Sequence, residues 1–223
     1  MARPICLILL LWLPWTVSGA VDARQLGARY DADRSHIAFR VYSAHATRIE
    51  VWIYKNAAGA QERVRYVMTR DAASNVWSKT VSVATLKRTY GIDGPVYYGY
   101  RAWGPNWPFT SGWSKGSSRG FIADVDTAGN RFNPNKLLLD PYARELSHDP
   151  QTPTQTDGTR YATGAQFRSL DTGAIAPKGI VLPPSVIDTG IKPARGLKDD
   201  VIYEVHVRGL TMHDASVPQA MRG

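Results

Sequence analysis

The chain has 223 residues, 43% of them hydrophobic, with a formal net charge of +8 and one cysteine, Cys6. This length is enough for one hydrophobic core and the beginning of a second. The basic residues are scattered rather than clustered in a stripe, so we expect no nucleic-acid partner. A single cysteine excludes a disulfide framework and a metal site built from several thiolates.

Residues 1–20 have the pattern of a secretory signal peptide. Arg3 precedes an apolar run over 5–15, and Ser18-Gly19-Ala20 places small residues at the cleavage position. A membrane anchor is the alternative, but it needs roughly 20 apolar residues and this run is shorter. Cleavage after Ala20 would also remove Cys6. We therefore expect a secreted chain, extracellular or periplasmic, with no membrane segment in the mature form.

The region that follows consists of short alternations of apolar and polar residues. The alternating runs cover 26–30, 36–43, 49–54, 63–68, 76–83 and 96–103, with turn residues between them. No convincing helical period is present. Six short strands with frequent turns predict a mostly β fold, with an antiparallel, immunoglobulin-like β-sandwich over 21–125.

The second half of the chain has a different composition. Residues 126–198 are rich in proline, glycine and threonine, which predicts an irregular connector wrapped over a neighbouring surface. Asp200–Thr211 then alternates again, and Ile202 makes one end of it apolar on both faces. That pattern predicts a strand with neighbours on both sides, so we interpret 199–223 as the beginning of another domain.

The aromatic residues are densest at the end of the predicted sandwich, where seven lie in 17 residues: Tyr97, Tyr98, Tyr100, Trp103, Trp107, Phe109 and Trp113. Flat aromatic faces fit the C–H faces of sugar rings. Trp103, Trp107 and Trp113 are therefore candidate substrate-binding residues. The alternative is that these rings are buried, in the core of the sandwich or against a second domain.

Acidic and histidine residues indicate no catalytic group by their spacing. The segment 124–130 resembles the beginning of a calcium loop but lacks the closing glutamate, so a turn capped by Asx side chains is favoured. Asp149, which precedes Pro150, is either a turn residue or a single ligand of a metal site that is completed elsewhere.

Three blocks of this sequence resemble bacterial secreted isoamylases. Tyr97-Tyr98-Gly99-Tyr100-Arg101-Ala102-Trp103-Gly104-Pro105-Asn106-Trp107-Pro108 resembles the end of their N-terminal module, and 131–143 and 199–211 resemble the next two blocks. These enzymes belong to glycoside hydrolase family 13, and their N-terminal domain is similar to carbohydrate-binding module family 48. The resemblance implies that 199–223 is the first strand of a (β/α)8 catalytic barrel.

The resemblance also implies an activity for the parent protein, which is hydrolysis of α-1,6 branch points in glycogen and amylopectin. The family uses an aspartate nucleophile, a glutamate acid and a second aspartate, and none of them matches a position here. We therefore expect an inactive N-terminal fragment with α-glucan as its partner. A non-catalytic secreted glucan-binding module is the alternative, and a pullulanase-like or cytoplasmic debranching relative is a third possibility.

A calcium ligand follows from the resemblance as well. The family's calcium-binding segment matches residues 142–149 and assigns one ligand to Asp149. Calcium takes about six to eight oxygen ligands, so we expect calcium in the intact parent and none bound by this fragment alone.

Overall fold

The computed structural model describes residues 22–150, 158–184, 190–191, 194, 196–201 and 203–222. They belong to two compact units, one up to Pro184 and the other from Ser185 onward. No helix among these residues is long and apolar enough to cross a membrane.

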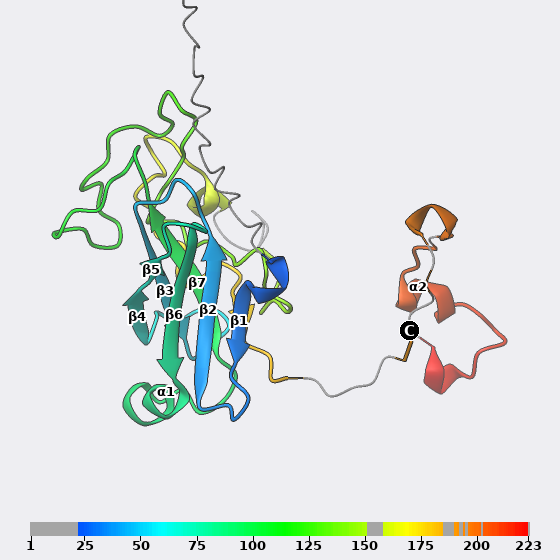
Figure 1. The fold of residues 1–223 in the computed structure, drawn as a ribbon. Helices are drawn as coiled ribbons and strands as arrows, with labels where there is room; N and C mark the ends of the chain where they lie inside the picture. Colours follow the sequence, from blue (N-terminus) through cyan, green and yellow to red (C-terminus); the bar gives the residue numbers. More distant parts are fainter. Residues whose placement is uncertain are drawn as a thin grey trace, which may run out of the picture. The chain divides into compact units, whose positions relative to one another are not determined.

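The first unit contains two antiparallel sheets (Figure 1), which we call sheet A and sheet B. Sheet A has the strand order β1-β2-β6-β5 and sheet B has the order β4-β3-β7-β8. The strands are β1 (Gly27–Tyr30), β2 (His36–Tyr42), β3 (Arg48–Tyr54), β4 (Val64–Val67), β5 (Thr69–Arg70), β6 (Val76–Ser82), β7 (Tyr97–Trp103) and β8 (Gly179–Ile180). The predicted antiparallel sandwich is confirmed.

The space between the two sheets is filled by an apolar cluster, which we call the inner core. Strand β2 contributes Ile37, Phe39 and Val41, and β3 contributes Val51 and Ile53. Successive side chains of a strand point to opposite faces, so the alternation in the sequence sends one face of each strand inward. Burying one side chain of this kind contributes roughly 1.5–3 kcal/mol.

Helix α1 (Val83–Tyr90) follows β6 directly, where the sequence predicted only the end of a strand and no helix. That prediction is wrong. The Ser82 hydroxyl accepts a hydrogen bond from the backbone N–H of Thr85 at 3.4 Å, and Gly91 ends the helix at φ 65°. Two turns are too short to show a clear period, but a serine before the helix and a glycine after it are the usual start and stop signals.

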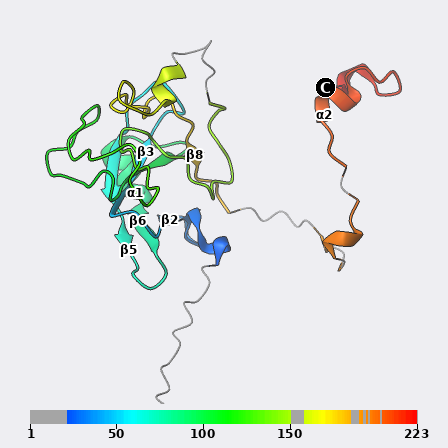
Figure 2. The same cartoon turned by 90° about the horizontal axis from the view of Figure 1, so that it is seen from above.

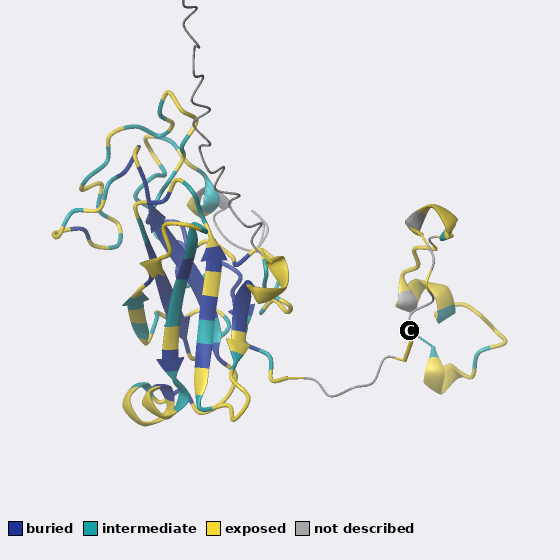
Figure 3. Cartoon of the chain, in the orientation of Figure 1, coloured by how far each residue is buried: buried dark blue, intermediate teal, exposed yellow. Residues whose placement is uncertain are grey.

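The two central strands of sheet B are buried on both faces (Figure 3), since every residue of β3 and β7 after the first is buried. The outer face of the sheet is covered by residues 104–150 and 158–184, which we call the cover and whose green and yellow loops lie on the β3 and β8 side in Figure 2. Much of the predicted connector is therefore irregular but packed within the first unit. Its residues Gly179 and Ile180 form β8 and pair with β7.

The second unit contains helix α2 (Val207–Thr211) and two short 3-10 turns at 197–199 and 219–221. The strand predicted over 200–211 is wrong for its described residues. The His206 ring accepts a hydrogen bond from the backbone N–H of Gly209 at 3.0 Å and begins a helix instead. Val201 and Tyr203 are 95% and 81% exposed. A strand needs neighbours for its backbone groups, and no described strand pairs with this segment.

Candidate functional site

The three candidate tryptophans lie together at the outer face of sheet B, where Trp103 at the end of β7 packs with Trp107 and Trp113 of the cover. They share a second buried cluster, here called the outer core, with Trp52, Tyr54, Leu137 and Ala176. Trp103, Trp107 and Trp113 are 0%, 1% and 7% exposed. The sequence left open whether these rings bind sugar or are buried, and the structure shows that the rings are buried.

Edge-to-face packing orients the rings of the outer core. The Trp103 and Trp113 centroids are 5.0 Å apart at 88°, and Trp52 meets Trp113 at 6.5 Å. The Trp107 indole N–H donates to the backbone oxygen of Arg119 at 2.9 Å. The Trp103 and Trp113 indole nitrogens have no hydrogen-bond partner among the described residues. These ring faces contact protein, and a role in sugar binding stays a prediction.

Arg101 is the central charge of the outer core and is fully buried. Its guanidinium donates to Asp171 Oδ1 at 2.5 Å and to the backbone oxygen of Pro134 at 2.7 Å. It also lies over the Trp52 ring, 4.1 Å from the centroid. Asp171 and Pro134 both belong to the cover, so this one side chain ties two distant parts of the cover to β7.

Two buried lysines fix the cover in the same way. Lys178 donates to the backbone oxygens of Ala57 and Ala176, each at 3.0 Å, and lies 4.6 Å from the Tyr54 ring centroid. Lys136 donates to three backbone oxygens of the cover, including that of Leu170 at 2.9 Å. Burial lowers the pKa of each lysine to about 8. Both ammonium groups donate hydrogen bonds to backbone oxygens of irregular segments, which are not paired in a sheet.

The buried carboxylates are also engaged in structural contacts. Glu50 accepts hydrogen bonds from Arg48 at 2.6 Å and from the Trp52 indole at 3.0 Å. Asp140 accepts one from the Tyr98 hydroxyl at 2.7 Å, and its burial raises the pKa of this carboxyl. Glu50 links neighbouring side chains of β3, and Asp140 links the cover to β7.

The acidic loop after residue 123 is a capped turn, as the sequence favoured. Asp126 Oδ1 accepts hydrogen bonds from the backbone N–H groups of Ala128 and Asn130 at 3.0 and 2.9 Å. Asp149 lies elsewhere and is exposed. Among the described residues no group of three or more acidic, histidine or cysteine side chains is placed to hold a metal ion. Asp149 and its described neighbours therefore do not by themselves fit a calcium ion, which needs more oxygens.

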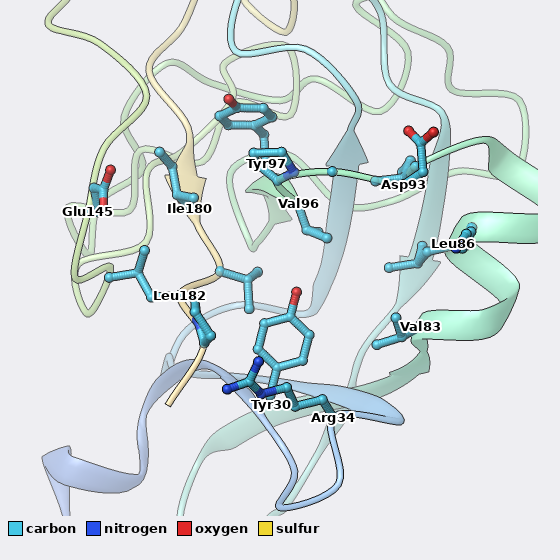
Figure 4. A pocket seen from close by; sticks show the side chains of 16 residues that line it. Tyr30, Arg34, Val83, Leu86, Asp93, Val96, Tyr97, Glu145, Ile180 and Leu182 are labelled. Carbon is cyan, nitrogen blue, oxygen red and sulfur yellow. The ribbon is translucent and has the colours of Figure 1, made fainter. Parts of the chain in front are cut away.

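A cleft of about 640 Å³ opens between the edges of the two sheets, bounded by β1, β8 and helix α1 (Figure 4). Its floor is apolar and buried, formed by Leu86, Ile92, Val96 and Val181. The Tyr30 hydroxyl points into it from the β1 side. Four distant parts of the chain meet here, and no pattern in the sequence indicated it.

The rim of this cleft carries charges of both signs. Arg34 and Lys87 are its cations, and Asp93 and Glu145 are its carboxylates. A hydrogen bond from its own backbone, assisted by Lys55 at 3.4 Å, lowers the pKa of Asp93. Burial raises the pKa of Tyr30, so its hydroxyl stays protonated at neutral pH. The cleft therefore offers hydrogen-bonding groups above an apolar floor without an excess of either charge.

Two packed antiparallel sheets with an aromatic second core are the architecture of a β-sandwich module. The family described as carbohydrate-binding module 48 (isoamylase N-terminal domain) matches residues 25–143, more than half of the chain. The chain belongs to this family.

Curated relatives agree with that assignment. The isoamylase of Flavobacterium sp. is 62% identical over 92% of this chain, and the match spans 26% of that protein. The glycogen debranching enzyme of Klebsiella pneumoniae is 31% identical over 89% of this chain and 25% of its own. The chain thus spans about a quarter of the length of these relatives.

Among solved structures, the GBS pullulanase SAP in complex with maltotetraose matches 86% of this chain and 19% of its own, at 22% identity. The TM-score of this match is 0.47.

Proposed function

We propose that this chain is the non-catalytic N-terminal part of an isoamylase-type glycoside hydrolase that acts on α-1,6 branch points of glycogen and amylopectin. The observation that carries the proposal is the 62% identity to an isoamylase over 92% of the chain. The non-catalytic part of the proposal is supported by the buried acids Glu50 and Asp140 and by the half-buried Asp171. Each of them is engaged by a neighbouring side chain.

A debranching assay tests this proposal. Purified chain is incubated with amylopectin, and new reducing ends are measured, with the Flavobacterium isoamylase as the positive control. We expect release by the control and none by this chain. Any turnover by this chain above a heat-treated sample would contradict the proposal, because the hydrolysis would then need acids within these 223 residues.

A second candidate is an α-glucan-binding module, and it is favoured by the family match over residues 25–143. Affinity electrophoresis in gels with and without glycogen tests it. A binding module migrates more slowly in the glycogen gel, while an equal mobility in both gels would leave only a supporting role for the sandwich.

We further propose export and a calcium site for the parent protein. The pattern of residues 1–20 supports export with cleavage after Ala20. Mass measurement of protein recovered outside the cytoplasm would show a chain that begins at Val21. Asp149 would supply one calcium ligand, and the other ligands would come from parts of the parent outside this chain. Calcium affinity of the parent should then fall in Asp149→Ala.

A further inference from the structure

The cleft at the open edge of the sandwich has the size of a ligand site. Its volume of about 640 Å³ lies within the range of roughly 300–1,000 Å³ that is usual for small-molecule sites. Its floor residues Leu86, Ile92, Val96 and Val181 belong to the inner core, and of its lining Tyr97 packs against the outer core.

The chemistry of the lining favours a neutral ligand with both apolar and hydroxyl surfaces. The rim carries two cations and two carboxylates, so no net charge selects an ion. A strongly hydrated ion would also gain nothing from a floor of leucine, isoleucine and valine. A pyranose ring offers C–H faces to such a floor and hydroxyls to charged rim groups and to Tyr30.

We propose that this cleft binds a short stretch of linear α-glucan. The sugar packs against Val96 and Val181, and its hydroxyls bond with Tyr30 and with the carboxylates of Asp93 and Glu145. The choice of an α-glucan as ligand rests on the proposed function, while the position of the site rests on the geometry alone.

Two substitutions probe the cleft without cutting into the core. Gly94 lines the cleft, a Cβ there would meet no atom within 4 Å, and its φ is not positive. Gly94→Trp therefore adds bulk at the cleft wall. Tyr30→Phe removes only the hydroxyl. Thr80→Trp is the control, because it introduces the same side chain at an exposed position of β6, a strand that does not line the cleft.

The experiment is calorimetric titration of the full chain and each variant with maltohexaose, after thermal melts confirm that all are folded. We expect binding by the unsubstituted chain and by Thr80→Trp. Gly94→Trp should bind at least tenfold more weakly. Tyr30→Phe should bind about fivefold more weakly, the usual effect of one lost hydrogen bond.

The outcomes separate the two proposals. No binding by the unsubstituted chain, or equal binding by Gly94→Trp and Tyr30→Phe, would overturn the cleft as a glucan site. Neither result affects the proposal that this chain is the non-catalytic part of an isoamylase-type enzyme, which the amylopectin assay tests separately. Binding that is lost in Thr80→Trp as well would place the ligand elsewhere and would also overturn the cleft.

Discussion

The inner core and the outer core lie on opposite faces of sheet B, yet they are built differently. The inner core is made of aliphatic and aromatic side chains supplied mainly by the regular strands. The outer core contains four tryptophans and lies against Arg101 and Lys178, both fully buried. A regular sheet covers the first, and irregular loops cover the second. Loops leave backbone oxygens unpaired, and the buried cations provide donors for them.

The two cores share strands, which makes their stabilities inseparable. In β3, Val51 and Ile53 point to the inner core while Trp52 and Tyr54 point to the outer core. Loosening either face therefore disturbs the same backbone. We expect the first unit to unfold in one transition, in which both cores lose their packing together.

The largest effect is expected from Phe39→Ala in the inner core. Phe39 is fully buried and meets Tyr98 at 5.1 Å between ring centroids. Truncating such a ring lowers the free energy of unfolding by about 3–5 kcal/mol. Urea unfolding measures the change, and Tyr42→Ala, at an exposed position of the same strand, should change it by no more than about 0.5 kcal/mol. A loss below about 1 kcal/mol for Phe39→Ala would contradict this view of the inner core, because burying such a side chain contributes more than that.

The next effect is expected from Arg101→Ala in the outer core. The change leaves Asp171 and the backbone oxygen of Pro134 without their donor, and breaking a buried pair costs about 3 kcal/mol or more. Arg24→Ala removes an exposed ion pair with Asp22 and should cost less than about 1 kcal/mol.

Two probes distinguish a shared transition from a separate one in Arg101→Ala. Far-ultraviolet circular dichroism follows the sheets, and tryptophan emission follows mainly the outer core. Both midpoints should fall together. A fall in the emission midpoint alone would show that the cover opens independently, and the two cores would then be separate folding units.

A smaller effect is expected from pH acting through Lys178. Its pKa is lowered to about 8, so between that pH and its ordinary value near 10.5 the unfolded chain binds more protons than the folded chain. Unfolding then takes up protons, and the free energy of unfolding rises with pH across this window. The rise should be smaller in Lys178→Met by an amount on the order of 1 kcal/mol.

Lys55→Met supplies the control for that pH series, because Lys55 is partly exposed and pairs with Asp93 at the surface. It should leave the slope of stability against pH unchanged. An equal slope in Lys178→Met and the unsubstituted chain would show that Lys178 does not contribute to the pH dependence of stability between about pH 8 and 10.5.

No effect is expected on tryptophan emission when maltohexaose is added. All five tryptophans of the described residues are buried, so a sugar in the cleft at Tyr30 does not reach them. A shift in their emission maximum on titration would instead indicate stacking on the outer core. The binding site would then lie among Trp103, Trp107 and Trp113, as the sequence first suggested.

Local pattern predicted the parts of the fold that depend on neighbours in the sequence. The alternation at 36–43 and 49–54 is visible without a structure, because one strand face must be apolar to meet a second sheet. The capped turn at Asp126 is equally local. Helix α1 escaped prediction because eight residues with one buried side chain, Leu86, show little periodicity.

Other features depend on contacts between distant residues and could not be predicted. The alternation over 200–211 indicates a strand, but a strand also needs a partner, and the described residues form a short helix there instead. The cleft was missed for a similar reason, since Tyr30, Leu86, Val96 and Val181 are widely separated along the chain.

The sequence by itself determined the β-sandwich, its strands and the family resemblance, because these depend on side-chain alternation and on contiguous blocks of residues. Only the tertiary structure decided what the aromatic run at the end of β7 does. The order of residues in this run does not reveal whether the tryptophan rings face solvent or protein. Burial of Trp103, Trp107 and Trp113 follows from a cover that Arg101, Lys136 and Lys178 hold in place.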